Sequence, residues 1–202
     1  MAPTLYHCTN TRSMRPLWTL EELGVDFTLE TMPFPPRYTV PGYKEINPLG
    51  TIPCYVDGNL NMTESAAICH YLVEKHGPTD LAVTPDDPEY GDYLNWLHRS
   101  DATFTFPQAL ILRYTVLEPE ERRSPQVAED YRKWFLARMR SVETALETRD
   151  YLCAGRFTIA DICVGFAIHH AVLLGIEEVL TPNTAAYWER LQARPAYDRA
   201  CR

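Results

Sequence analysis

The sequence has no long apolar run. Apolar residues make up 46% of the chain, but none of their clusters approaches the roughly 20 consecutive residues that a membrane-spanning helix needs. The first residues, MAPT, have neither the basic start nor the apolar stretch of a secretory signal. These absences predict a cytoplasmic protein that does not enter a membrane.

Paired cysteines are also lacking. The six cysteines stand at positions 8, 54, 69, 153, 163 and 201, without the Cys-x-x-Cys spacing of a redox motif or of a metal site. This excludes a thioredoxin-type disulfide oxidoreductase. Most of the cysteines have apolar neighbours, so we expect reduced and buried thiols. His169 and His170 have no partner at ligand spacing, and we expect no bound metal.

Basic residues are few, and no basic stripe offsets the acidic surface. The chain has 19 Lys and Arg against 27 Asp and Glu, for a net charge of −8. This balance argues against nucleic acid or an anionic membrane as a partner. An anionic ligand needs local positive charge, which Arg12, Arg15, Arg37 and Lys44 could supply. Arg37 and Lys44 are equally well explained as ordinary solvated side chains.

The first third of the chain predicts an α/β domain. Alternating patterns indicate strands at residues 4–7 and 27–32, on either side of a helix at 13–23 that ends at Gly24. A short helical turn at 43–46 is followed by a hairpin of residues 53–56 and 60–62 across Asp57-Gly58, and by a helix at 64–75. The order βαβ and then ββα is that of a thioredoxin-like domain.

The rest of the chain has a helical pattern. Residues 78–88 contain prolines and aspartates without periodicity, which is typical of a linker. A helical pattern covers 89–114, where Pro107 should kink or interrupt it. The segment 127–146 is amphipathic, and its expected apolar face carries Trp134, Phe135, Met139, Val142 and Leu146. We therefore predict a thioredoxin-like domain at 1–77, a linker at 78–88 and a C-terminal helical bundle at 89–202.

Thr158 and Asp161 have the spacing of a capping box at the start of a helix. The Thr158 hydroxyl can accept from the third backbone N–H of the helix, while the Asp161 carboxylate reaches back to the N–H of Thr158. Because this spacing already satisfies a helix start, we favour a role in folding over a role in substrate choice.

Two neighbouring segments indicate a site for a small peptide. Segment 47–53 reads NPLGTIP, and Pro53 belongs at the first residue or the edge of a strand because it cannot donate to a ladder. A cis Ile52-Pro53 bond would turn the backbone N–H and C=O of Ile52 outward, toward an added peptide strand. Glu64 and Ser65 open the next helix, whose N-terminus attracts carboxylates. The alternative is that Thr63, Glu64 and Ser65 only cap the helix.

The order of these motifs resembles that of the glutathione transferases, and the likeness covers nearly the whole chain. It includes LYH at 5–7, the helix MRPLWTLEELG at 14–24 and GRFTIADI at 155–162. The resemblance implies glutathione as cosubstrate, no metal and a homodimer. It assigns the cysteinyl backbone of glutathione to Ile52 and Pro53 and the γ-glutamyl end to Glu64 and Ser65. We add Arg12 and Thr51 to the expected glutathione-binding residues.

The resemblance places the group that stabilises the glutathione thiolate between Cys8 and Ser13. Counting back from Arg15, the serine or cysteine of many classes falls on Asn10, and the serine of a further class falls on Thr11. The expected catalytic residues are therefore Asn10, Thr11 and Ser13, although Ser13 is equally well explained as a helix N-cap. Tyr6 and Cys8 remain weaker alternatives.

The electrophile is expected against the helical domain. The candidate residues, His98, Asp101, Phe104 and Thr105, lie in one helical stretch whose aromatic side chains suit a small apolar or aromatic compound. Each aromatic residue could instead belong to the core. The predicted function is a glutathione transferase with a role in detoxification. The alternatives are a non-catalytic binding or carrier protein, which Asn10 favours, and a glutathione-dependent isomerase, peroxidase or reductive lyase.

Overall fold

The computed structural model describes residues 2–202, which divide into two compact units. The first unit comprises the residues up to Ala82 together with Gln192–Arg202, and the second is Val83–Leu191. The change of unit lies within the segment expected to be a linker. Residues 192–202 belong to the first unit, whereas the domain prediction assigned them to the helical part.

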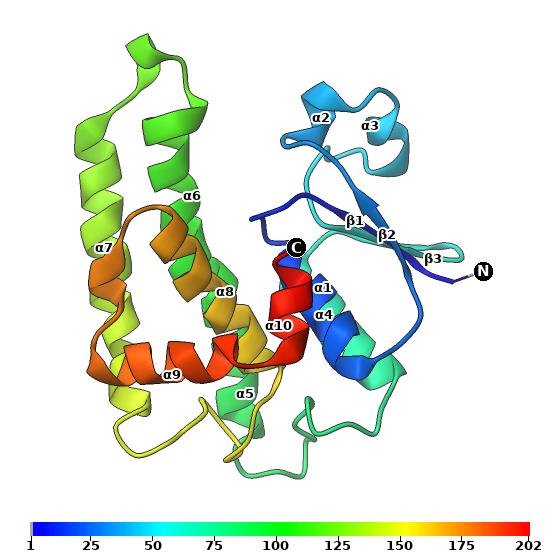
Figure 1. The fold of residues 1–202 in the computed structure, drawn as a ribbon, viewed down its shortest axis with the longest axis vertical. Coiled ribbons are helices and arrows are strands. Elements are labelled where there is room, and N and C mark those ends of the chain that lie inside the picture. The colour runs from blue at the N-terminus through cyan, green and yellow to red at the C-terminus, as the bar shows by residue number, and fades with distance from the viewer. Residues whose placement is uncertain (1) are drawn as a thin grey trace. The chain divides into compact units, whose positions relative to one another are not determined.

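The first unit is built on a four-stranded mixed sheet. Strands β1 (Thr4–His7), β2 (Thr28–Thr31), β3 (Cys54–Asp57) and β4 (Leu60–Met62) lie in the order β2-β1-β3-β4. The β1–β2 pair is parallel, while β1–β3 and β3–β4 are antiparallel. Helices α1 (Met14–Leu23) and α4 (Ser65–Lys75) lie on one side of the sheet, and the short α2 (Pro36–Thr39) and α3 (Tyr43–Ile46) lie on the other (Figure 1). The arrangement confirms the predicted thioredoxin-like fold.

The last helix, α10 (Pro195–Ala200), packs against α1. The rings of Trp18 and Tyr197 meet edge to face, with their centroids 5.0 Å apart. Arg194 donates two hydrogen bonds to the carboxylate of Glu22, at 2.6 and 2.8 Å. These contacts explain why residues 192–202 belong to the first unit: the partners of this helix lie almost a whole chain length away in sequence.

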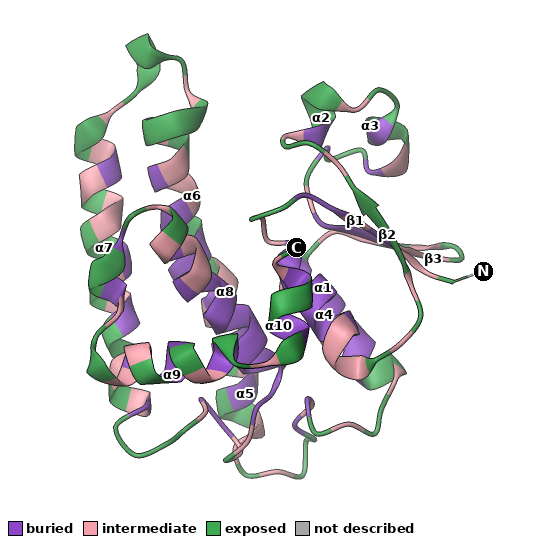
Figure 2. Ribbon diagram, viewed as in Figure 1, coloured by how far each residue is buried: buried purple, intermediate pink, exposed green. Residues whose placement is uncertain are grey.

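The second unit is helical. Its main helices are α5 (Tyr90–Arg99), α6 (Phe106–Leu112), α7 (Pro125–Ala145), α8 (Ile159–Leu173) and α9 (Pro182–Gln192). Short 3-10 turns lie at Glu120–Arg122 and Glu177–Val179, and π-helical segments at Ser100–Thr105 and Arg113–Leu117. Helix α8 is buried along most of its length (Figure 2). Across residues 2–202, no helix is both long and apolar enough to cross a bilayer.

The interruption expected at Pro107 is present as a π-helical turn that directly precedes α6. The Phe106 N–H donates to the carbonyl of Asp101 five residues before it, and the Thr105 hydroxyl donates to the carbonyl of Ser100 at 3.0 Å. Proline has no N–H and cannot continue the regular ladder, so α6 starts anew with Pro107 in its first turn.

Helix α7 buries a narrower face than predicted. Phe135, Met139, Val142 and Leu146 are buried, but the Trp134 side chain is 51% exposed, so its assignment to the buried face was wrong. One residue turns an α-helix by about 100°, which places Trp134 beside the apolar stripe rather than in it. Its ring is covered by the guanidinium of Arg138, 3.8 Å from the ring centroid.

The capping box at the start of α8 is confirmed. The Ala160 N–H donates to the Thr158 hydroxyl at 3.2 Å, and the Thr158 N–H donates to the Asp161 carboxylate at 2.8 Å. The same carboxylate accepts from the Leu152 N–H at 3.0 Å and from the Tyr187 hydroxyl at 2.9 Å. Asp161 is fully buried, and burial raises its pKa to about 6 against the opposing effect of these donors. It therefore joins three segments of the unit.

Candidate functional site

Strand register brings the predicted glutathione-binding segments to one end of the sheet. In the antiparallel β3–β4 pair, Tyr55 is opposite Met62, so the residues before β3 and those after β4 lie at the same end. In the antiparallel β1–β3 pair, Tyr6 is opposite Cys54, which brings the loop after β1 to that end as well. Three segments therefore converge there, namely residues 8–13, 51–53 and 63–65.

The loop before β3 is held by buried polar groups. The carbonyl of Thr51 accepts from the Tyr43 hydroxyl at 2.6 Å and from the Asn47 side-chain amide at 2.8 Å. The Asn47 amide oxygen accepts in turn from the N–H of Leu49 at 3.1 Å. Thr51, predicted to bind glutathione, thus already holds this loop in shape through its carbonyl. Tyr43 and Asn47 were not among the predicted site residues, and the NPLGTIP pattern alone does not reveal their roles.

Ile52 keeps its backbone groups available. The Ile52–Pro53 bond is cis, as the sequence interpretation considered. Within residues 2–202, no hydrogen bond joins the N–H or C=O of Ile52 to another group of the chain. An extended peptide can therefore pair with both groups, in the manner of an added strand.

Glu64 and Ser65 begin α4 without capping it. Glu64 occupies the N-cap position, is exposed and makes no side-chain cap hydrogen bond. The Ser65 side chain is buried, and its hydroxyl accepts a 3.0 Å hydrogen bond from the fully buried guanidinium of Arg15. The alternative that these residues only cap the helix therefore lacks its defining contact. The first turn of α4 retains backbone N–H groups that an anion could meet.

Ser13 lies inside a closed hydrogen-bond network. Its side chain is 0% exposed, and its hydroxyl is 2.8 Å from Nδ1 of His7 and accepts from the N–H of Cys8 at 3.2 Å. The Thr11 hydroxyl is also 2.8 Å from that of Ser13. Ser13 is the N-cap residue of α1 by position but makes no side-chain cap bond. In this arrangement the Ser13 side chain is enclosed by protein, which does not favour its expected catalytic role.

Asn10 and Thr11 are the accessible residues of the same loop. Asn10 is exposed and has a positive φ of 61°, a conformation that asparagine tolerates better than most residues. Thr11 is half-buried, and its hydroxyl donates to the carbonyl of Cys8 at 2.8 Å. That bond uses the only proton of the Thr11 hydroxyl, whereas the Asn10 side chain is exposed to a ligand.

Cys8 and Tyr6 are poor candidates for the same role. Cys8 is 0% exposed, and burial raises the pKa of its thiol to about 11, so the reactive thiolate is disfavoured. The pKa of Tyr6 is raised as well, chiefly by burial and to a smaller extent by the charges of the nearby Cys54 and Glu30. Its ring meets that of Tyr43 edge to face, with centroids 6.1 Å apart.

The predicted electrophile residues differ in their accessibility. His98 on α5 is exposed, and Asp101 in the π-helical segment is half-buried. Phe104 is 0% exposed and lies against Trp96, with ring centroids 6.5 Å apart, while Thr105 is 2% exposed. Phe104 and Thr105 therefore belong to the core of the second unit. The helical spacing of apolar residues in the sequence cannot distinguish a residue that lines a pocket from one that is buried in the core.

Comparison with known proteins decides the family. Residues 11–75 match the model of the glutathione S-transferase N-terminal domain, and residues 107–195 match that of the C-terminal domain. Glutathione S-transferase 4 of Zea mays is 30% identical over 92% of this chain and 85% of its own length. The chain belongs to the glutathione S-transferase family. Membership confirms the predicted family and the glutathione transferase activity.

The similarity to other relatives of this transferase also covers nearly the whole chain. Glutathione S-transferase 3 of Schizosaccharomyces pombe is 27% identical over 95% of the chain and 84% of its own length. The solved theta class transferase of Xanthomonas axonopodis pv. citri, with glutathione bound, is 29% identical with a TM-score of 0.85, covering 99% of this chain and 97% of its own. The URE2P6 transferase of Phanerochaete chrysosporium, in complex with oxidized glutathione, is 27% identical with a TM-score of 0.83, covering 98% and 94%.

Proposed function

We propose that this transferase binds glutathione where the loop after β1, the loop before β3 and the start of α4 converge. It stabilises the glutathione thiolate with Asn10 and directs it at a small apolar or aromatic electrophile. The convergence of these three segments, set by strand register, is the observation that carries the proposal. The working form is a cytoplasmic homodimer.

The peptide part of glutathione pairs with the backbone of Ile52. The free N–H and C=O of this residue suit the cysteinyl residue, which has one donor and one acceptor of its own. The γ-glutamyl end carries an ammonium group and a carboxylate. Glu64 meets the ammonium, and the Ser65 hydroxyl with the first N–H groups of α4 meets the carboxylate. Arg12 and Thr51 lie in the flanking loops, where they contact the ligand's periphery.

Activation of glutathione requires preferential binding of its thiolate. A free thiol has a pKa of about 8.5, so only a small fraction of glutathione is present as the thiolate at neutral pH. Lowering that pKa by about two units corresponds to roughly 2.7 kcal/mol of preferential stabilisation. The Asn10 side-chain N–H donates to the thiolate, and the positive end of the α1 dipole adds to this effect. Together they supply a stabilisation of that size. Because an amide cannot form a mixed disulfide, we do not expect cysteine-type deglutathionylation.

The principal alternative is a glutathione-binding protein without catalysis. Asn10 in place of a hydroxyl or thiol favours it. Isomerase, peroxidase and reductive lyase activities are also open, since they share the same activated thiolate and differ in the electrophile. His98 and Asp101 are the candidate residues on the helical side, because they are at least partly exposed.

Ultraviolet difference titration of bound glutathione tests the proposal. We expect a thiol pKa well below that of free glutathione, because Asn10 stabilises only the thiolate. An unshifted pKa with saturable binding would leave a binding protein and reject catalysis. Absence of saturable binding would reject the site itself, and sedimentation equilibrium tests the dimer separately.

A further inference from the structure

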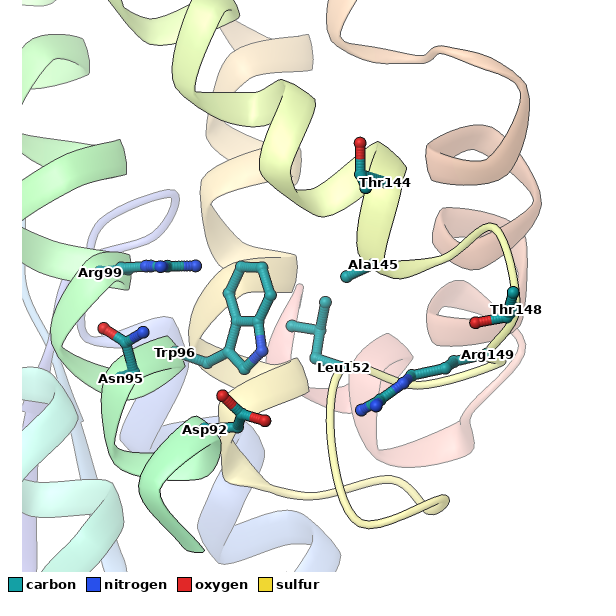
Figure 3. Close-up of a pocket in the computed structure, with 9 residues that line it drawn as sticks. All are labelled: Asp92, Asn95, Trp96, Arg99, Thr144, Ala145, Thr148, Arg149 and Leu152. Atoms are coloured by element: carbon teal, nitrogen blue, oxygen red, sulfur yellow. The ribbon is translucent and has the colours of Figure 1, made fainter. Parts of the chain in front are cut away.

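The helical unit contains a pocket that shares no residue with the candidate glutathione site. Its volume is about 320 Å³, near the lower end of the range for small-molecule sites. One wall is α5, and the other is the end of α7 with the loop that follows it (Figure 3). The ring of Trp96 lies between the two walls (Figure 3) but is only 6% exposed, so the pocket lining is mainly polar with one narrow aromatic edge.

Two opposite charges at this pocket are unpaired. Within residues 2–202, neither the Arg99 guanidinium nor the Asp92 carboxylate has an ion-pair partner or a side-chain hydrogen bond. Arg99 instead lies over the Trp96 ring, 5.0 Å from its centroid. By contrast, Arg149 on the facing loop donates to Glu89 at 2.7 Å, which offsets its charge. The pocket therefore offers one cation and one anion to a ligand.

Helix geometry sets the separation of these charges. Asp92 and Arg99 lie seven residues apart on α5, so they are two turns apart on the same face, with their Cα atoms roughly 10 Å apart along the helix axis. Trp96 lies on that face between them. A ligand that meets both charges must therefore carry its own opposite charges at its two ends.

The pocket lies on a different side of α5 from the predicted electrophile residue of that helix. Asp92, Trp96 and Arg99 follow the spacing of one helix face. His98 is two residues after Trp96, which turns it by about 200° around the helix. The exposed His98 and the pocket therefore serve different surfaces of the helical unit.

We propose that this pocket binds a small zwitterion with separated charges, its carboxylate on Arg99, its ammonium on Asp92 and its apolar body against the exposed edge of Trp96. Each charged contact supplies a directed hydrogen bond, and the narrow Trp96 edge adds apolar contact. Occupancy is independent of glutathione because the two sites share no residue.

Calorimetric titration with para-aminomethylbenzoate tests this site. Saturable binding is expected, with affinity at least about tenfold weaker for para-methylbenzoate and for para-methylbenzylamine, which each lack one charge. Equal binding of all three compounds would overturn the proposal. So would displacement of the zwitterion by glutathione or by a chlorodinitrobenzene, since either would make the pocket part of the transferase site.

Two variants assign the charges. Arg99→Gln should lose the preference for the carboxylate, and Asp92→Asn should lose the preference for the ammonium, each with an affinity loss of about tenfold for the zwitterion. Arg138→Gln is the matched control, since Arg138 also covers a tryptophan ring but lies outside the pocket. Wild-type binding by both pocket variants, or an equal loss in the control, would overturn the assignment. Unchanged glutathione binding in all three variants verifies that they fold.

Discussion

The guanidinium of Arg15 donates a 3.0 Å hydrogen bond to the hydroxyl of Ser65, and both side chains are buried. This bond ties the first turn of α1 to the first turn of α4. The start of α4 is where the carboxylate of the γ-glutamyl end is proposed to bind. A residue far from Ser65 in sequence thus helps to position it.

Replacing Arg15 and Ser65 by alanine, singly and together, tests their coupling. Each single change should lower the free energy of unfolding by about 1 to 3 kcal/mol, because it removes a hydrogen bond between two buried polar groups. The double variant should lose less than the sum by about 1 kcal/mol or more. Urea unfolding measures the cycle, and both single variants should also bind glutathione more weakly. Strictly additive losses would show that the bond contributes nothing.

Asn10 and Ser13 should separate activation from folding. Asn10→Ala should raise the pKa of bound glutathione by about one unit, since it removes a thiolate donor worth about 1.4 kcal/mol, while Asn10→Ser keeps a donor and should change it less. Ser13→Ala should leave that pKa nearly unchanged but reduce stability, because it breaks the contacts to His7 and Cys8. Difference titration and urea unfolding distinguish these outcomes. The reverse pattern would return Ser13 to the active site.

Gly50 and Gly58 form a matched pair for the loop before β3. Both have positive φ, 62° and 59°, but a Cβ on Gly50 would lie 2.7 Å from Cβ of Arg37, whereas one on Gly58 would meet nothing within 4 Å. Gly58→Ala should cost about 1 kcal/mol from backbone strain alone. Gly50→Ala should cost about 1 to 3 kcal/mol more from the clash and weaken glutathione binding. Thermal unfolding and calorimetry measure both, and equal behaviour of the two variants would refute the close contact.

Asp161→Ala should destabilise the helical unit strongly. The change removes a buried acceptor of bonds from Thr158, Leu152 and Tyr187, and we expect a loss of about 3 to 5 kcal/mol. Asp150→Ala is the control, because that carboxylate is 80% exposed in its ion pair with Arg190 and should change stability by less than about 1 kcal/mol. A stable Asp161→Ala protein with altered substrate preference would instead indicate a direct role in function.

His7 should make stability depend on pH. Burial lowers the pKa of His7 below its ordinary value of 6.5, so the unfolded chain takes up this proton more readily than the folded protein. The free energy of unfolding should therefore fall as pH drops below about 6.5, with a slope of at most about 1.4 kcal/mol per pH unit. His7→Gln lacks the titrating group and should show a smaller decrease. Identical pH profiles for the two proteins would contradict the assignment.

Much of the first domain follows from local sequence rules. The predicted strands at 4–7 and 60–62 and the helical turn at 43–46 have the same bounds in the structure. The interruption at Pro107 and the capping box of Thr158 and Asp161 were also predictable, because each depends on residues only a few positions apart. Helix α7 shows the limit, since Trp134 was placed in the buried face and lies 51% exposed.

The sequence by itself determined the family, through the order of its motifs, and the order of strands and helices, because local periodicity, proline and glycine act over short distances. Only the tertiary structure decided that Ser13 is enclosed, that Thr51 holds its own loop and that Arg15 supports Ser65. It also decided that α10 packs on α1. Those outcomes depend on burial and hydrogen bonding between residues distant in sequence. Strand register and packing, rather than residue type, select which polar groups remain accessible.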